Sequence, residues 1–259
     1  SMIGVGTIGN LLASYPMAFA ETMIGWRATM VCLAVLCAII AVGVQVTVKD
    51  PEKAVSETKG SLLDVLRIPA LWLIAPIAIV SYVPAAAIRG AWMGPYLNEV
   101  HGLSSSEIGT AALIMGIAMI GGVFLYGPLD RWFGTRKWVV FGGNILTLCF
   151  LLGLYAFGAS SYIVTIIMLC GVGFFGATFP VVIAHGKGFF PAHLTGRGVT
   201  LLNMFSIGGV GLAQMVARPL HDSYQGTDAA APFAAVFLLF AVMLITGLSL
   251  YLFSQDNTD

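Results

Sequence analysis

Charged side chains are scarce in this sequence of 259 residues, which has 12 lysines and arginines, 12 aspartates and glutamates and four histidines. Only 9% of the residues are charged, whereas about 25% is usual in a soluble domain. The apolar fraction is 58% and the mean hydropathy is +0.93. So few charges cannot cover a soluble globule with this much apolar area. The composition also excludes a disordered chain, and it predicts a lipid bilayer as the surrounding solvent.

Other absences narrow the class of function. Basic and acidic residues balance, so no basic patch is left over for a nucleic acid. No CxxC or Cys/His spacing occurs among the four cysteines, and the HExxH pattern of zinc enzymes is missing. We therefore expect no metal, cofactor or disulfide framework, and no enzymatic activity. The cysteines are interpreted as small buried hydrophobic residues: Cys32, Cys37, Cys149 and Cys170.

Long apolar runs are what the sequence has instead. A membrane-spanning helix needs about 20 apolar residues, and eight stretches reach roughly this length. Their length and low polarity favour helices over the strands of a barrel. The sequence therefore predicts an all-α, polytopic transmembrane helix bundle with about eight helices. The candidate spans are approximately 3–20, 28–48, 70–96, 107–127, 138–157, 161–184, 198–219 and 231–253.

The distribution of lysine and arginine predicts the orientation. Nine of these twelve residues lie in the segments 49–69, 128–137 and 185–197. The other three lie on the opposite side: Arg27, Arg89 and Arg218. Because cytoplasmic loops are enriched in positive charge, the three segments and both termini of this fragment are expected in the cytoplasm, with the chain in a cell inner (plasma) membrane. The residues expected to face outward are His101, Tyr162 and Asp222.

The long polar stretch 49–69 is interpreted as a cytoplasmic linker with a short amphipathic helix from Ser61 to Arg67. It separates two helices in 1–48 from six helices in 70–259. Six helices make a complete bundle if they form two three-helix repeats, whereas two helices do not. We therefore expect residues 1–48 to be the last two helices of an incomplete N-terminal bundle. A native start at the first residue stays an alternative.

The segment 127–137, GPLDRWFGTRK, resembles the G-x-x-x-D-R-x-G-R-K loop of the major facilitator superfamily (MFS). In that family the loop joins the second and third helices of each six-helix half on the cytoplasmic side, which is its expected place here. Gly127 is one position too close to Asp130, and Phe133 adds a residue before Gly134. The resemblance covers the whole chain and implies the last eight of twelve helices of such a transporter.

The resemblance implies secondary active transport of a small solute by alternating access. The partners it implies are the bilayer, a small-molecule substrate, a coupling ion such as H⁺ and the missing N-terminal helices. Gly127, Pro128 and Gly134 are expected to form the turn, while Asp130 pairs with a nearby arginine or faces a helix N-terminus. The candidate conformational-lock residues are Gly127, Asp130, Arg131, Gly134, Arg136 and Lys137. A topology anchor without a lock is the alternative.

Arg89 is the most informative candidate for substrate binding. It lies about six residues outward of the middle of its span. A charge inside the membrane costs free energy, so an arginine at this depth is a candidate for a functional residue. Its guanidinium suits a carboxylate or phosphate, so an organic anion is favoured as the solute. Pro84 and the pair Gly94–Pro95 are expected to interrupt the helix on either side. Snorkelling beside Trp92, or an ion pair with a glutamate, is the alternative.

Further polar residues lie at membrane depth. Tyr82, Asn203 and Gln214 are candidates for the substrate cavity, and Asn203 and Gln214 share a helix face because they are eleven residues apart. Interhelical hydrogen bonding is the alternative for this pair. His185 is expected in a loop beside Lys187, with a proton-coupling role as the other interpretation.

Two other classes of function stay open at this point. A membrane receptor or scaffold would bind a solute without moving it, and a polytopic membrane enzyme would need a catalytic group that the sequence does not offer. No aspartate or glutamate lies deep in a candidate span. A carboxylate for proton coupling is therefore expected in the missing helices.

Overall fold

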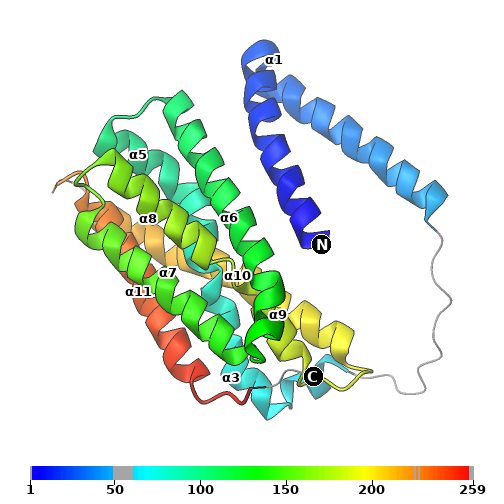
Figure 1. Ribbon diagram of the computed structural model, residues 1–259. Coiled ribbons are helices and arrows are strands. Elements are labelled where there is room, and N and C mark those ends of the chain that lie inside the picture. The colour runs from blue at the N-terminus through cyan, green and yellow to red at the C-terminus, as the bar shows by residue number, and fades with distance from the viewer. Residues whose placement is uncertain (1, 49–60, 225, 227, 257–259) are drawn as a thin grey trace. The chain divides into compact units, whose positions relative to one another are not determined.

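The computed structural model describes residues 2–48, 61–224, 226 and 228–256, without the side chains of 2–19, 21 and 22 (Figure 1). All regular elements in these residues are helices, which confirms the predicted all-α class. Seven of the described helical stretches are long and apolar enough to cross a membrane: Met23–Thr47, Pro69–His101, Ser105–Phe133, Lys137–Phe157, Tyr162–Lys187, Thr195–Ser223 and Ala231–Tyr251. The chain divides into two compact units, Ser1–Lys59 and Gly60–Asp259.

The first unit consists of α1 (Met2–Thr47), which contains a sharp break. Gly25 has φ 79° and ψ 157°, a backbone conformation that is essentially restricted to glycine, so α1 is in effect two helices. The second expected span, 28–48, corresponds to Met23–Thr47. The first, 3–20, has a helical backbone, but its side chains lie outside the described residues.

The second unit begins with α2 (Leu62–Leu66), where the short helix from Ser61 to Arg67 was expected. Ser61 and Asp64 form a capping box, in which the Ser61 amide donates to Asp64 Oδ2 at 2.7 Å. The remainder of the expected linker, 49–60, lies outside the described residues.

Six spans follow, and two of them are interrupted. The first span is divided into α3 (Pro69–Ser81), α4 (Val83–Ala87), the π-helical turn η1 (Ile88–Trp92) and α5 (Met93–His101). The fourth is divided into α8 (Tyr162–Phe175) and α9 (Phe179–Lys187). The continuous spans are α6 (Ser105–Phe133), α7 (Lys137–Phe157), α10 (Thr195–Ser223) and α11 (Ala231–Tyr251).

The span Pro69–His101 is the centre of this unit. In its most apolar stretch 67% of the residues are buried, against 22% for Ser105–Phe133. Helices α9, α10 and α11 all pack on α3, and α7 lies beside α11 (Figure 1). The approach of α10 to α3 is so close that a Cβ on Gly209 would collide with the carbonyl oxygen of Ile79. Small residues allow such backbone contact between membrane helices.

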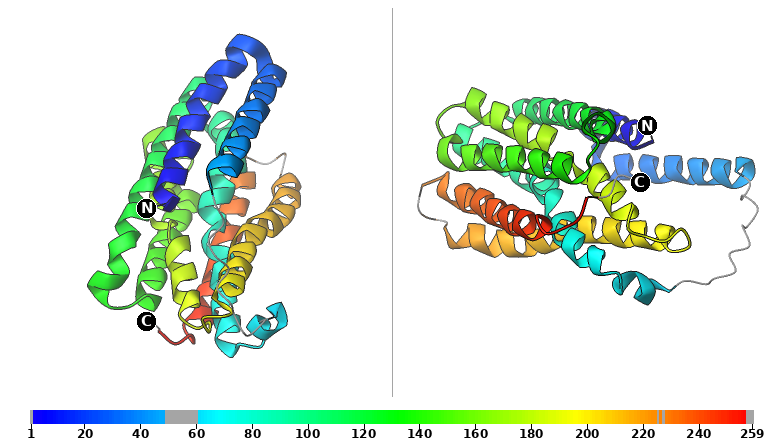
Figure 2. Two further views of the ribbon diagram at one scale, coloured as in Figure 1. Left: turned by 90° about the vertical axis from the view of Figure 1, so that its right-hand side faces the viewer. Right: turned by 60° about the horizontal axis from the view of Figure 1, so that its bottom comes forward.

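The second unit has two ends, which we name after a residue at each. The Asp130 end gathers the start of α3, the α6–α7 turn, the end of α9 and the segment after α11. Figure 2 shows the last described residues at the same end as the α6–α7 turn and α2. The His101 end contains the end of α5, the α7–α8 turn and the start of α11.

Two expectations about the Asp130 end are wrong in detail. Helix α6 continues through Gly127 and Pro128 to Phe133, so the turn begins only at Gly134, which has φ 62°. One proline removes a single amide donor, which a membrane helix tolerates. His185 is not in a loop but in α9, where it is fully buried. Its burial is tolerated because both ring nitrogens have hydrogen-bond partners.

Candidate functional site

The first interrupted span carries the predicted anion-binding residue. The helix breaks at Tyr82, two residues before Pro84, because proline lacks the amide that would continue the hydrogen-bond ladder. Arg89 lies in the π-helical turn η1 and is partly exposed. Single π-helical turns are rare and occur frequently at functional sites. The interruption that Pro84 predicted therefore exists. Helix α5 continues through Gly94 and Pro95, and the second irregular stretch is instead the π-turn before them, which contains Arg89.

Gln214 of α10 bridges this turn. The Trp92 indole donates to Gln214 Oε1 at 2.7 Å, and Gln214 Nε2 lies 3.5 Å from the Ala87 carbonyl oxygen, just before the π-turn. A side chain from a neighbouring helix thus binds backbone near the irregular turn, as membrane helices require. Gln214 therefore takes part in the interhelical bonding that was its alternative interpretation. Asn203 is exposed about 16 Å away along the same helix, so only Gln214 lies at the π-turn.

Polar side chains also support the second interruption, between α8 and α9. The Tyr126 hydroxyl donates to the Phe175 carbonyl oxygen at 3.0 Å. Asn144 of α7 donates to Thr178 Oγ1 at 3.0 Å, and both of these residues are buried. The Phe175 carbonyl and the Thr178 hydroxyl at this break are thus bound by neighbouring helices rather than left unpaired in an apolar environment.

The two interruptions meet at Tyr82. Its ring lies on that of Phe179, the first residue of α9, with centroids 5.2 Å apart. Sequence reasoning selected Tyr82 but missed Phe179, although the pair Phe179–Pro180 is a recognisable helix start. Trp92, which was considered as an interfacial neighbour of Arg89, is buried against His221 and Phe233 instead.

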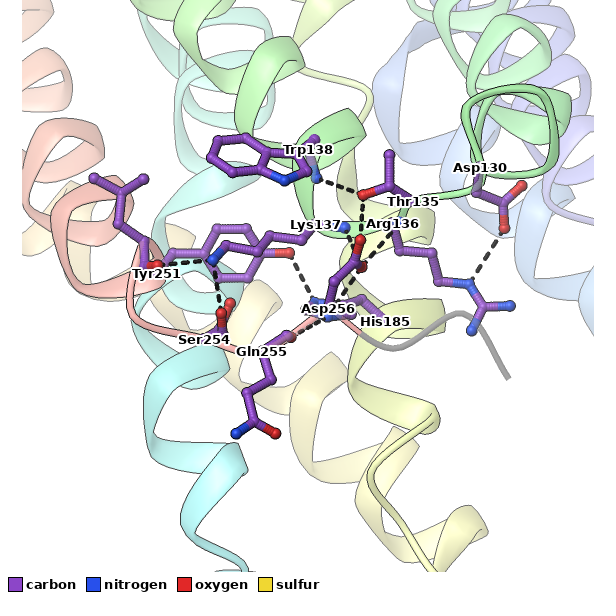
Figure 3. Close-up of polar contacts among 11 residues, drawn as sticks. Asp130, Thr135, Arg136, Lys137, Trp138, His185, Tyr251, Ser254, Gln255 and Asp256 are labelled. Atoms are coloured by element: carbon purple, nitrogen blue, oxygen red, sulfur yellow. Dashed lines mark hydrogen bonds and ion pairs between the residues drawn. The ribbon is translucent and has the colours of Figure 1, made fainter.

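The predicted lock loop forms a second polar site (Figure 3). Asp130 pairs with Arg136, with Nε and Oδ2 3.3 Å apart, which is one of the pairings expected from the sequence. Gly134 makes the turn, and Arg131 is exposed on α6. Gly127 is in the helix beside a small pocket of 140 Å³ between α6 and α9.

Asp256 extends this site in a way that the sequence did not predict. Its carboxylate accepts from the amides of Arg136, at 3.2 Å, and Lys137, at 2.9 Å, and from the Thr135 hydroxyl (Figure 3). It therefore caps the N-terminus of α7, where amides are free and the helix dipole favours a negative charge. Partial burial raises the pKa of Asp256, but the Thr135 hydroxyl and the two amides outweigh this and hold the pKa below its usual value.

Lys137 makes the reciprocal contact. Its ammonium group donates to the carbonyl oxygens of Leu252, at 2.8 Å, and Ser254, at 2.7 Å, just beyond α11. Cations are favourable there because the last carbonyls of a helix have no intrahelical donors. An anion from the segment after α11 thus caps α7, and a cation from α7 caps α11.

His185 joins α9 to the same segment. Its Nε2 lies 3.0 Å from the Gln255 carbonyl oxygen, and its Nδ1 lies 2.7 Å from the Tyr251 hydroxyl (Figure 3). A carbonyl oxygen can only accept, so Nε2 carries the hydrogen and Nδ1 of the neutral ring accepts from Tyr251. This arrangement satisfies the imidazole, the hydroxyl and the carbonyl together.

A bundle of apolar helices in which two interrupted spans meet is typical of secondary transporters. The comparison with protein families agrees, because the family model of the Major Facilitator Superfamily matches residues 77–259. The chain belongs to this superfamily and is a multi-pass membrane protein. The family predicted from the lock loop is thereby confirmed.

A relative in Escherichia coli (strain K12) carries the name "Putative transporter AraJ". It is 24% identical to this chain over 188 residues, which are 70% of this chain and 46% of the relative. The chain thus spans about half the length of this relative. The similarity agrees with a transporter family.

Proposed function

We propose that this chain is part of a secondary active transporter, without enzymatic activity, that moves a small organic anion by alternating access. Its place is the cell inner (plasma) membrane, with the Asp130 end in the cytoplasm. In this proposal, two halves of six helices each, one of them the six-helix unit described above, rock about a central site between them, as in other transporters built from repeats. The coupling ion in this proposal is H⁺.

The single observation that carries the proposal is the contact between the two interrupted spans at Tyr82 and Phe179. Irregular backbone at membrane depth is tolerated where it is buried in protein or lines a water-filled cavity. In transporters such interrupted helices hold the substrate near the middle of the membrane. The π-turn places Arg89 on one of these two spans.

Arg89 is the proposed anion-binding residue. An arginine in the middle of a spanning helix costs about 2.5–3.5 kcal/mol, and less toward the interface, so its presence in this turn needs a compensating role. The planar guanidinium can bind a carboxylate or phosphate through two parallel hydrogen bonds. Tyr82, Asn203 and Gln214 are proposed to line the same cavity, with Gln214 also supporting the π-turn through Ala87 and Trp92.

The lock loop is proposed to hold the Asp130 end in one conformation. The Asp130–Arg136 pair is partly buried, with 19% of each side chain exposed, so water and salt weaken it less than a surface pair. Gly134 supplies the turn, while Gly127, Arg131 and Lys137 complete the loop.

The orientation rests on the basic residues of the Asp130 end. Single cysteines on a background without native cysteines would be labelled from outside intact cells with an impermeant reagent. We expect positions 136 and 187 to be protected and positions 162 and 222 to react. Reaction at 187 but not at 162 would reverse the proposed orientation.

The substrate role is tested in the full-length protein with Arg89→Lys and Arg89→Ala. Arg218→Ala is the matched control, because Arg218 is an exposed arginine on a neighbouring span toward the same end. We expect uptake of an organic anion into proteoliposomes to be lost in Arg89→Ala and to show weaker apparent affinity in Arg89→Lys, with normal expression of both.

An interfacial anchor predicts the opposite pattern. Lysine would then restore full function, and alanine would lower insertion or stability rather than affinity. Unchanged affinity in both Arg89 variants would remove the substrate role. A loss in Arg218→Ala equal to that in Arg89→Ala would show that any outer arginine matters equally, and would also contradict the proposal.

A further inference from the structure

We propose that the segment Leu252–Asp256 is a clasp that ties the half-helix α9 to the N-terminus of α7. The clasp has to release when α9 moves, and in this respect it rests on the proposed transport cycle. It is built from two sets of contacts, one to α9 and one to the α6–α7 turn and the first residue of α7 (Figure 3).

The contact to α9 is made by His185, which is fully buried. Both of its ring nitrogens bind groups at or beyond the end of α11, namely the Tyr251 hydroxyl and the Gln255 carbonyl. No water can replace these partners while the imidazole stays buried, so leaving them unmade is costly. Helix α9 therefore cannot move away from α11 without breaking both hydrogen bonds.

The contact to α7 is made by the next residue along the chain. Asp256 binds the Thr135 hydroxyl and the amides of Arg136 and Lys137, and its Oδ1 lies 3.9 Å from His185 Nε2. Hydrogen bonds to a charged group are stronger than neutral ones. Because Gln255 and Asp256 are adjacent, a displacement of either end of the clasp is transmitted directly to the other.

The clasp has room to move on its other side. A cavity of 260 Å³ separates it from the start of α3, and its walls include Leu73, Phe189 and Phe253. Closely packed interiors resist displacement, whereas a void leaves neighbouring groups free to shift. Helix α9 is also a separate unit, because the break after Phe175 disconnects it from α8. The clasp thus holds the end of a half-helix whose start is held separately, through Thr178 and Phe179.

Hydrogen–deuterium exchange of the full-length protein in nanodiscs tests the coupling without any solute. In Asp256→Ala we expect the amides of 135–138 to exchange roughly tenfold faster or more, and those of 182–188 in α9 to accelerate as well. Asp228→Ala is the matched control, since Asp228 is an exposed aspartate at the other end of α11. Tyr251→Phe removes only the hydroxyl and should accelerate exchange in both regions, to a smaller extent.

The pattern of exchange separates a clasp from a local cap. Acceleration of 135–138 alone in Asp256→Ala, with α9 unchanged, would show that Asp256 caps α7 and nothing more. Acceleration of α9 alone in Tyr251→Phe would likewise contradict transmission from one end to the other, because coupling between two sites is reciprocal. Equal rates of amide exchange in Asp256→Ala and Asp228→Ala would contradict the proposed clasp.

Release during transport is tested by a reversible cross-link. Phe189→Cys and Phe253→Cys, on a background without native cysteines, place two thiols on the walls of the same cavity. A cleavable bifunctional thiol reagent should stop uptake of the anion, and reduction of the linker should restore it. Undiminished uptake after complete cross-linking would show that the clasp need not release. Absence of uptake before cross-linking would count against the proposed function and leave the exchange result standing.

Discussion

The two ends of the six-helix unit are held together by different interactions. At the His101 end, the rings of Trp92, Tyr96, His221, Phe233 and Phe237 pack on one another, with centroids between 4.8 and 6.4 Å apart. At the Asp130 end, an ion pair, two reciprocal helix caps and a buried imidazole make the connections. Aromatic packing depends on close contact over large areas, whereas the polar contacts are few and directional.

This difference indicates which end can open. Separating the aromatic rings would create cavities in a closely packed core, which costs free energy in proportion to their volume. The contacts of Asp256 and Lys137 at the Asp130 end can be exchanged for contacts with water once the segment after α11 moves, so the net cost of breaking each of them is small. The comparison thus favours the Asp130 end as the part that rearranges, in agreement with the proposed clasp.

The largest expected loss of stability comes from a substitution at the His101 end. Tyr96→Ala removes a buried ring that contacts His101, Phe233 and Phe237, and it should lower the free energy of unfolding by about 3 kcal/mol. Unfolding by a denaturing detergent, followed by loss of helical signal, would measure this. Tyr155→Ala is the control, because Tyr155 is 48% exposed on α7. Equal losses of unfolding free energy in the two variants would show that the aromatic packing at the His101 end does not contribute more than an exposed ring does.

A smaller effect is expected when the pH is lowered, and it should be confined to the amides of the Asp130 end. The folded-state pKa of Asp256 lies below that of the unfolded chain, so its contribution is complete above the unfolded value and is lost as the pH falls through the folded value. Below about pH 4, we therefore expect faster amide exchange in 135–138 than the intrinsic pH dependence gives. The Asp256→Ala variant should lack this excess.

The amides of 162–168 at the His101 end serve as an internal control for this measurement. The start of α8 is held by Ser161, whose hydroxyl accepts from Val164, and by Thr165, whose hydroxyl donates to the Gly158 carbonyl. None of these groups is a carboxylate, so acid should leave their protection unchanged. An equal acid effect at both ends would show that the comparison between them is wrong.

The spans were predictable because a membrane imposes a length and an apolar composition that few other environments require. Pro84 also predicted that this span is interrupted, because proline has no amide hydrogen to donate to the helical ladder. The π-turn at Arg89 was not predictable, because which turn widens depends on the partners that Gln214 offers from another helix. The two interruptions meet through Phe179, whose role depends entirely on tertiary contact.

The clasp could not be predicted at all. Asp256 and Thr135 are 121 residues apart, and a polar segment after the last apolar run resembles any solvated chain end. His185 beside Lys187 resembles a loop residue, because the signal that distinguishes a buried histidine is its partners rather than its neighbours in sequence. Contacts between distant polar groups leave no periodic pattern, whereas apolar spans do.

The smallest expected effect concerns the Asp130–Arg136 pair, and it refines the comparison within the Asp130 end. The pair joins residues on either side of the turn at Gly134, six positions apart, and so it connects only the two consecutive helices α6 and α7. Asp130→Asn should therefore lower the free energy of unfolding by about 1 kcal/mol or less. High salt should reduce the difference from the parent, because screening weakens a partly exposed ion pair.

Asp256 connects helices that are distant in sequence, so its loss should reach further than that of Asp130. In Asp130→Asn we expect faster amide exchange at 131–136 and unchanged exchange in α9, whereas Asp256→Ala should accelerate both. If Asp130→Asn loosened α9 as strongly as Asp256→Ala, the ion pair rather than the segment after α11 would hold the half-helix. The predicted lock loop would then hold the Asp130 end closed by itself, without the clasp.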